Sequence, residues 1–136
     1  MRRPTTSPVS LVTSPPASED IRPEEVLDVR VERVRPELTV VHARGEIDMF
    51  TTPLLSDAIE KQFAQERCRV LVVNMLSVTF LSSNGLASLV EAQRMADSCG
   101  VTLRLVGTTR AVTRPLESTG ILSMFDVHRN LDSATR

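Results

Sequence analysis

Aromatic residues and net charge are both scarce in this sequence. It contains four Phe and no Trp or Tyr, so it lacks the aromatic platforms on which proteins stack single-stranded nucleic acid bases. Its 16 basic and 17 acidic residues leave a net charge of -1, which gives no electrostatic attraction to nucleic acid phosphates or anionic membranes. We therefore expect neither a nucleic acid nor a membrane among the partners.

Cysteine, histidine and glycine are also scarce. Two Cys and two His provide neither a disulfide framework nor a repeated metal-ligand spacing. The five Gly form no phosphate-binding loop of the Gly-x-x-x-x-Gly-Lys or Gly-x-Gly-x-x-Gly type. A serine nucleophile would have only His42 or His128 as its base, and there is no Gly-x-Ser-x-Gly turn. We expect a protein that is not an enzyme and that binds no cofactor or metal.

Long apolar runs are missing too. No segment resembles a signal peptide or reaches the length of a transmembrane helix, so the expected location is the cytoplasm. A length of 136 residues is typical of one domain. Residues 1–24 hold five of the eight Pro and seven Ser or Thr, which predicts a flexible tail. The domain is then expected to span residues 25–136.

The hydrophobic pattern predicts a small α/β domain. Apolar residues alternate over 27–31, a β-branched run covers 38–43, and the short link between them favours an antiparallel hairpin. The continuous run Val70–Val73 is typical of a central strand, and alternation over 101–105 predicts one more. We expect a mixed sheet of four to five strands with an N-terminal β-hairpin and helices packed against it.

Three helices are expected between and after these strands. One begins near Thr51 and extends through Phe63, and a second runs from about Ser83 to a stop at Gly100, with Cys99 on its apolar side. The third covers about residues 109–119. Pro115 predicts a kink in it or a division into two short helices, because proline removes a backbone donor.

Four short segments form the most informative pattern. They are Gly45-Glu46-Ile47-Asp48, Val78-Thr79-Phe80-Leu81, Gly85-Leu86 and a closing stretch from Val112 to Phe125 that contains Leu116-Glu117-Ser118-Thr119-Gly120. Over about residues 26–131 the chain thus resembles the STAS domains of bacterial anti-sigma factor antagonists. The resemblance implies a binding module that docks on an anti-sigma factor of the histidine-kinase-like ATPase fold and releases its sigma factor. We expect a monomer or a weak dimer.

The expected partner-binding surface lies where two neighbouring strands end, since binding crevices of α/β folds gather at the carboxyl ends of strands. It comprises Asp48, Met49, Phe50, Thr51, Ser82, Ser83, Asn84, Gly85 and Leu86. Two alternatives stay open within this set. Asp48 either caps the following helix or contacts the partner, whereas Met49 and Phe50 either fill the core, the interpretation we favour, or are exposed anchors.

One residue departs from the family pattern at the position that matters most. In family members with an Asp-Ser-Ser/Thr-Gly loop the partner kinase phosphorylates the hydroxyl residue immediately before the glycine, and the resemblance places Asn84 there. An amide accepts no phosphoryl group, so the helix N-terminus lacks the added charge of about -1.5 to -2. We expect an antagonist without this switch, with Ser83 and Ser82 as the nearest substitute acceptors. Asn74 is a second departure, at a position where relatives have Asp at the end of the third strand.

Two further hypotheses concern the cysteines and the assembly. Cys68 and Cys99 are expected at one end of the sheet, where a redox-active disulfide would need Cα atoms within about 7 Å; two ordinary thiols are the favoured interpretation. The alternative function is a STAS-domain subunit or sensor of another assembly, in lipid transport, stress signalling or small-ligand sensing. A fold alone does not separate these functions, and the closing segment favours the antagonist.

Overall fold

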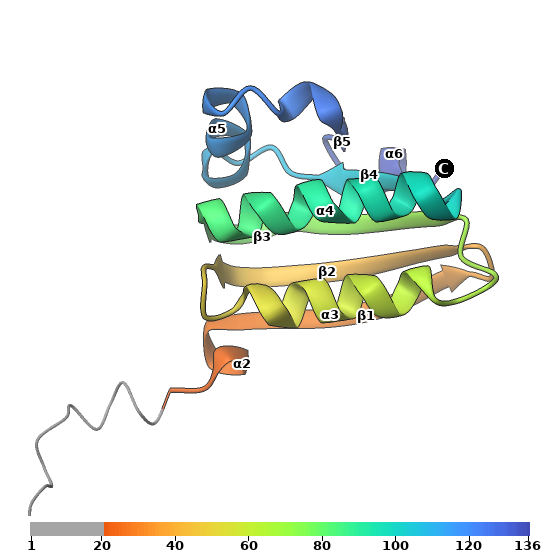
Figure 1. Ribbon diagram of the computed structural model, residues 1–136, viewed down its shortest axis with the longest axis horizontal. Helices are drawn as coiled ribbons and strands as arrows, with labels where there is room; N and C mark the ends of the chain where they lie inside the picture. The colour runs from red at the N-terminus through yellow and green to blue at the C-terminus, as the bar shows by residue number, and fades with distance from the viewer. Residues whose placement is uncertain (1–20) are drawn as a thin grey trace, which may run out of the picture.

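A five-stranded mixed sheet forms the centre of the domain (Figure 1). The computed structural model describes residues 21–136. The strand order is β1-β2-β3-β4-β5, with β1 antiparallel to β2 and the other neighbours parallel. The elements are α2 (Pro23–Val26), β1 (Leu27–Arg35), β2 (Leu38–Ile47), α3 (Thr52–Phe63), β3 (Val70–Leu81), α4 (Ser83–Cys99), β4 (Thr102–Val106), α5 (Arg110–Ser118), the 3-10 helix η2 (Leu122–Met124), β5 (Asp126–His128) and α6 (Leu131–Ala134). The predicted hairpin and mixed sheet are confirmed.

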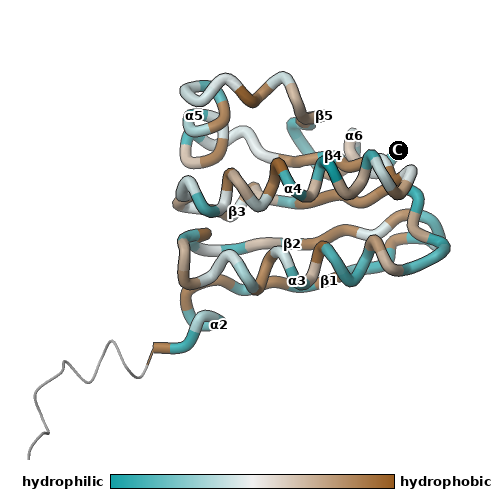
Figure 2. The backbone as a smooth tube through the Cα atoms, viewed as in Figure 1, coloured by the Kyte–Doolittle hydropathy of each residue, from teal (hydrophilic) through white to brown (hydrophobic). Residues whose placement is uncertain are grey.

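Helices α3 and α4 cover one face of this sheet. Leu55 and Ile59 of α3 and Leu89 of α4 are buried in the main core together with Leu71 and other strand residues. Figure 2 shows the alternation of hydrophobic and hydrophilic residues along both helices, as expected when one side of a helix is buried. Helix α4 ends as predicted at Gly100, which has a left-handed φ of 73°.

The short helix α6 covers part of the opposite face of the sheet, beside β4 and β5. Val40, Val72 and Val106 form a second apolar cluster there with Ala134 of α6. Because β3 is buried on both faces, its continuous apolar sequence is explained, and its predicted central place in the sheet is confirmed.

The third strand is longer than the sequence analysis expects. It continues to Leu81, so Asn74 lies inside β3 rather than at its end. The Asn74 side chain lies 2.9 Å from His42 Nδ1, and its oxygen accepts from the Leu76 N–H at 3.1 Å. The expected place of Asn74 at the end of the third strand is therefore wrong, and its amide is used within the sheet.

Other boundaries differ for local reasons. Helix α5 is one continuous helix that contains Pro115, and the predicted division is wrong. Val112 and Leu116, one turn apart, are both buried and hold the helix against the core despite the one backbone donor lost at proline. The expected tail falls mostly outside the described residues, and α2 already begins at Pro23, inside the last two residues assigned to that tail.

Candidate functional site

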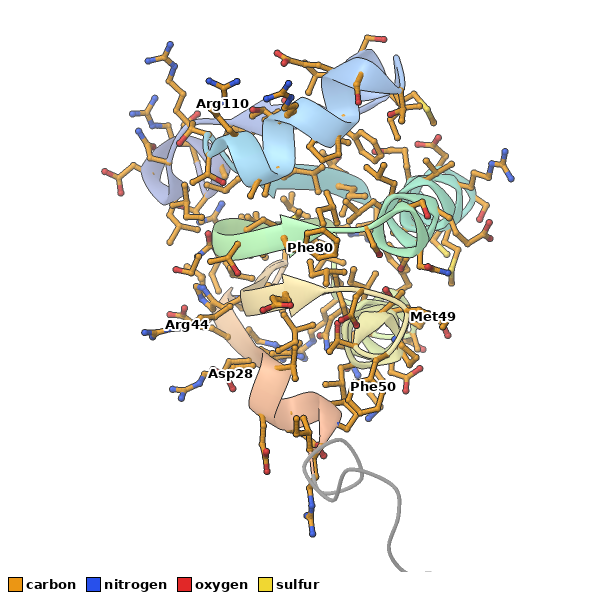
Figure 3. All side chains as sticks on the ribbon, turned by 90° about the vertical axis from the view of Figure 1, so that its left-hand side faces the viewer. Asp28, Arg44, Met49, Phe50, Phe80 and Arg110 are labelled. Atoms are coloured by element: carbon orange, nitrogen blue, oxygen red, sulfur yellow. The ribbon has the colours of Figure 1, made fainter. Side chains whose placement is uncertain are left out.

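Two connecting turns meet at the carboxyl ends of β2 and β3. Ile47 and Leu81 are the last paired residues of these parallel strands. The Ser82 N–H donates to the Ile47 carbonyl at 2.8 Å, so the turn after β2 and the start of α4 lie side by side. Figure 3 views the molecule from this end. The two segments that the sequence analysis singled out are brought together here.

The turn after β2 is organised by Asp48. The N–H groups of Phe50 and Thr51 donate to Asp48 Oδ1 at 2.9 and 3.0 Å. The Thr51 hydroxyl accepts from the Asp48 N–H at 2.9 Å and donates to the Glu46 carbonyl at 2.7 Å. These bonds hold the turn that precedes α3, whose N-cap residue is Thr51 and has no side-chain cap, so Asp48 does not itself cap the helix. Thr51 is 0% exposed, so its expected place in the partner-binding surface is wrong: its hydroxyl is consumed by the turn.

The N-terminus of α4 presents Ser83 and Asn84 to solvent. Ser82 is the N-cap residue, and its Oγ accepts from the Gly85 N–H at 3.3 Å. Ser83 and Asn84 are exposed, and the first turn of α4 contains no acidic residue. The partial positive charge of this helix end is therefore not offset by a side chain of the first turn.

Gly85 and Leu86 are buried, so the prediction that they contact a partner is wrong. Leu86 belongs to the main core. A Cβ atom on Gly85 would lie 2.6 Å from Leu81 Cδ1 and 2.7 Å from Ile47 Cγ2. This glycine lets the start of α4 approach the ends of β2 and β3, and it thereby positions the exposed Ser83 and Asn84 that precede it.

The glycine of the first motif has a similar structural role. Gly45 has a φ of +122°, and a Cβ atom there would clash with the carbonyl oxygen of Val26. Only glycine accommodates both this backbone conformation and the close approach of the chain at the start of β1. The motif residues Gly45 and Gly85 therefore shape the backbone of the site through close packing.

Large apolar side chains are exposed around these turns. Met49 is 75% exposed, Phe50 is 50% exposed and Phe80 is 49% exposed. The favoured interpretation of Met49 and Phe50 as core residues is wrong, because the hydrogen bonds to Asp48 hold this turn at the surface. Figure 3 shows Phe80 near the middle of this end of the molecule, with Met49 and Phe50 to one side.

Phe80 is a candidate partner-binding residue that is missing from the predicted surface. In the sequence it is used only as part of the family segment Val78-Thr79-Phe80-Leu81. A signal is nevertheless available in the sequence, because side chains alternate along a strand and Leu81 faces the core. Phe80 therefore points away from α4. It lies outside the apolar cluster that α6 helps to form on that face of the sheet.

The two cysteines are free thiols in different surroundings. Cys68 is buried and Cys99 is exposed. The expected place of Cys99 on the apolar side of α4 is wrong, because that side ends at Ala96 and the last turn is in solvent. Burial raises the pKa of the Cys68 thiol, against a smaller lowering by the Arg33 charge. A protonated, buried thiol is a poor nucleophile, which agrees with two ordinary thiols.

Comparison with known proteins identifies the family. A family model for the STAS domain matches residues 30–134. The chain belongs to the STAS domain family. This STAS domain is 32% identical over 96 residues to the anti-sigma-F factor antagonist RsfA of Mycobacterium tuberculosis, covering 70% of this chain and 75% of the relative. The family predicted from four short segments is confirmed.

Solved structures confirm the STAS fold. An anti-sigma factor antagonist from Mycobacterium paratuberculosis matches with a TM-score of 0.73 and 30% identity, over 85% of this chain and 96% of the other. The antagonist SpoIIAA in its unphosphorylated form matches with a TM-score of 0.66 and 16% identity, over 77% and 91% of the two chains. The latter likeness concerns the fold alone.

Neither a membrane-spanning helix nor a cluster of metal ligands is found among the described residues of this STAS domain. Between residues 21 and 136, no helix is both long enough and apolar enough to span a bilayer. In the same range, no three His, Cys, Asp or Glu side chains gather as candidate metal ligands.

Proposed function

We propose that this STAS domain is an anti-sigma factor antagonist that binds an anti-sigma factor of the kinase-like ATPase fold and releases its sigma factor. The binding surface is the docking face, which we define as Met49, Phe50, Phe80, Ser83 and Asn84. The exposure of three large apolar side chains beside a helix N-terminus carries this proposal. Clustered exposed apolar residues mark interaction sites, and aromatic anchors commonly dominate the energy of an interface.

The relatives support the same function. The curated relative at 32% identity and the solved relative at 30% identity are both named as antagonists of anti-sigma factors. In this chain the first three family segments meet at the docking face, where Ser82 and Asp48 hold the two turns by hydrogen bonds. A rigid surface loses little conformational entropy on binding, which favours affinity.

We also propose that docking is not controlled by phosphorylation at position 84. The Asn84 amide has no acceptor hydroxyl, and the Ser82 hydroxyl already caps α4. Ser83 is exposed and is therefore the remaining hydroxyl on this face. A related fold does carry a phosphoryl group, since SpoIIAA has also been solved in a phosphorylated form. Here the helix end carries no phosphoryl group at position 84, which keeps the docking face in its binding state.

Release of a sigma factor tests the function. Each anti-sigma factor of the ATPase fold encoded in the same genome is purified with its fluorescently labelled sigma factor, and this protein is titrated in with ATP. We expect release of sigma from at least one complex, seen as a fall in fluorescence anisotropy. No release from any complex would contradict the proposal and favour a subunit of another assembly.

Intact mass spectrometry of the same mixture tests the absence of the switch. We expect an unmodified protein after incubation with the partner kinase and ATP. The Asn84→Ser variant restores a hydroxyl at the family position, and we expect it to gain one phosphoryl group. Stoichiometric phosphate on Ser82 or Ser83 of the unaltered protein would overturn this part of the proposal.

A further inference from the structure

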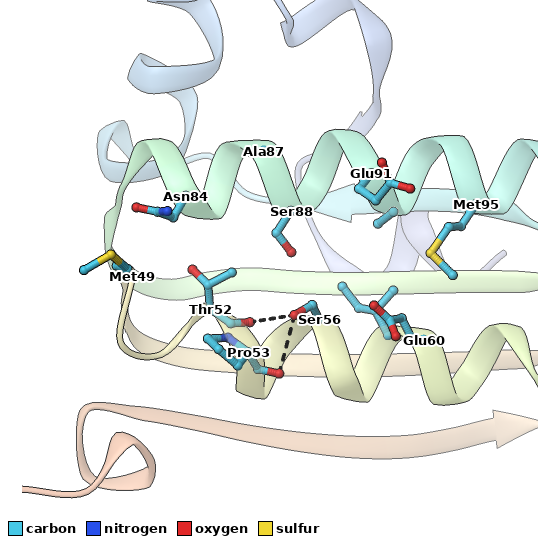
Figure 4. A pocket seen from close by; sticks show the side chains of 12 residues that line it. Met49, Thr52, Pro53, Ser56, Glu60, Asn84, Ala87, Ser88, Glu91 and Met95 are labelled. Atoms are coloured by element: carbon cyan, nitrogen blue, oxygen red, sulfur yellow. Dashed lines mark hydrogen bonds between the residues drawn. The ribbon is translucent and has the colours of Figure 1, made fainter.

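A groove runs between α3 and α4 and opens beside the docking face (Figure 4). Its volume is about 420 Å³. Met49 and Asn84 lie at one end of the groove, and Met95 lies toward the other. The distance from Asn84 to Met95 along α4 is about 16 Å, from the helical rise of about 1.5 Å per residue. The groove therefore extends the docking face over about three turns of helix.

The lining of this groove is apolar and acidic. Met49, Pro53, Ala87 and Met95 provide apolar walls, and α3 and α4 each add one carboxylate. These carboxylates are Glu60 and Glu91, both exposed, and none of the described residues that line the groove is basic. The ion pair that Glu91 makes with Arg94 on its own helix is a long one, at 3.9 Å. An occupant that matches this lining is apolar along its length and cationic at one point.

One hydroxyl at the groove lacks a partner. Ser88 Oγ is buried and makes no hydrogen bond with any residue between 21 and 136. The Ser56 hydroxyl across the groove is different, because it donates to the Thr52 carbonyl at 3.0 Å (Figure 4). An unpartnered buried polar group is unfavourable by about 1–3 kcal/mol. A polar side chain of an occupant would supply the missing partner.

The walls also determine what kind of segment fits. Both walls are helices whose backbone groups are already hydrogen-bonded within α3 and α4, so a strand cannot be added to them. Two parallel walls with apolar residues are the setting in which an amphipathic helix binds through its side chains. Methionine side chains such as Met49 and Met95 adapt to the shape of such a partner.

We propose that this groove binds an amphipathic helix of the anti-sigma factor, with an Arg or Lys of that helix placed between Glu60 and Glu91. This inference rests on the proposed function and names the chemistry of the partner. The aliphatic stem of the basic residue lies along the apolar walls, and its charged head pairs with the two carboxylates. The docking face and the groove then form one continuous surface through Met49 and Asn84.

Paired charge-neutralising variants test the groove. Glu60→Gln/Glu91→Gln removes the two carboxylates from the lining with little change in size. Its matched control is Asp57→Asn/Asp97→Asn, which removes the same charge from exposed positions on the same two helices outside the groove lining. We expect the first variant to bind the purified anti-sigma factor at least about tenfold more weakly and to lose much of the salt dependence of binding. The control should bind like the unaltered protein.

A filling variant and a mapping experiment complete the test. Ala87→Trp places a large side chain at an exposed position of the groove wall, and we expect it to block binding while the melting temperature stays unchanged. Hydrogen exchange in the complex should show protection over 52–60 and 84–95. If the unaltered protein binds but both groove variants bind equally well, this inference is overturned while the proposed function stands. If the unaltered protein binds no anti-sigma factor, both are overturned.

Discussion

Asn84→Asp should stabilise the domain while it weakens partner binding. Asn84 is the second residue of α4, is exposed, and lies in a first turn without acidic residues. A carboxylate there interacts favourably with the positive end of the helix dipole. Asp and Asn have nearly the same size and helix propensity, so the change tests charge alone.

The expected magnitude follows from these surroundings. A charge within the first turn of an exposed helix end contributes about 0.3–1 kcal/mol, which corresponds to a rise of about 1–4 °C in melting temperature for a domain of this size. Binding should respond in the opposite direction, because a partner that covers the introduced carboxylate must desolvate an unpaired charge. We expect a loss of at least about tenfold in affinity.

Thermal unfolding and binding to the anti-sigma factor provide the two measurements. Gln93→Glu is the matched control on the same helix. Its carboxylate would face Asp97, to which the Gln93 amide now donates at 3.0 Å, so we expect it to lower the melting temperature slightly and to leave binding unchanged. A lower melting temperature for Asn84→Asp, or unaltered affinity, would refute the reasoning about the α4 N-terminus.

Three other predictions concern backbone geometry, thiol reactivity and the pH dependence of stability. Gly45→Ala should destabilise the domain by about 2–5 kcal/mol, because its Cβ would meet the Val26 carbonyl; chemical denaturation measures this, and a loss below about 1 kcal/mol would contradict it. In native protein a thiol reagent should modify Cys99 quickly and Cys68 slowly, and the Cys99→Ser variant should lose the fast phase. Equal reactivity of both thiols would contradict the burial of Cys68. The raised pKa of Cys68 also predicts that the free energy of unfolding falls as the pH rises above the ordinary thiol range.

The sequence alone predicted those helices and strands whose hydrophobic pattern or terminal residue is local. Val70–Val73 predicted the central strand because both faces of β3 are buried, and Gly100 predicted the end of α4 because its φ is positive. The terminal β5 and α6 were missed, since three- and four-residue elements have too little periodicity to detect and depend on tertiary contacts.

The candidate site was predicted in position but not in detail. Segment order placed both turns at one end of the sheet, whereas burial depends on three-dimensional contacts. Thr51 is polar yet buried by its hydrogen bonds, and Met49 is apolar yet exposed. Residue type predicts the reverse in both cases. Only the fold shows that α3 and α4 leave a groove beside Asn84.

Removal of the Phe80 side chain tests the docking face most directly. Phe80→Ala should leave the fold intact, because the residue is 49% exposed, and should weaken anti-sigma factor binding by about 30-fold or more, the loss typical of an aromatic anchor. Val34→Ala is the control, since Val34 is 43% exposed and lies near the end of β1 that pairs with the start of β2, away from the docking face. Equal affinities of the two variants and the unaltered protein would contradict the account.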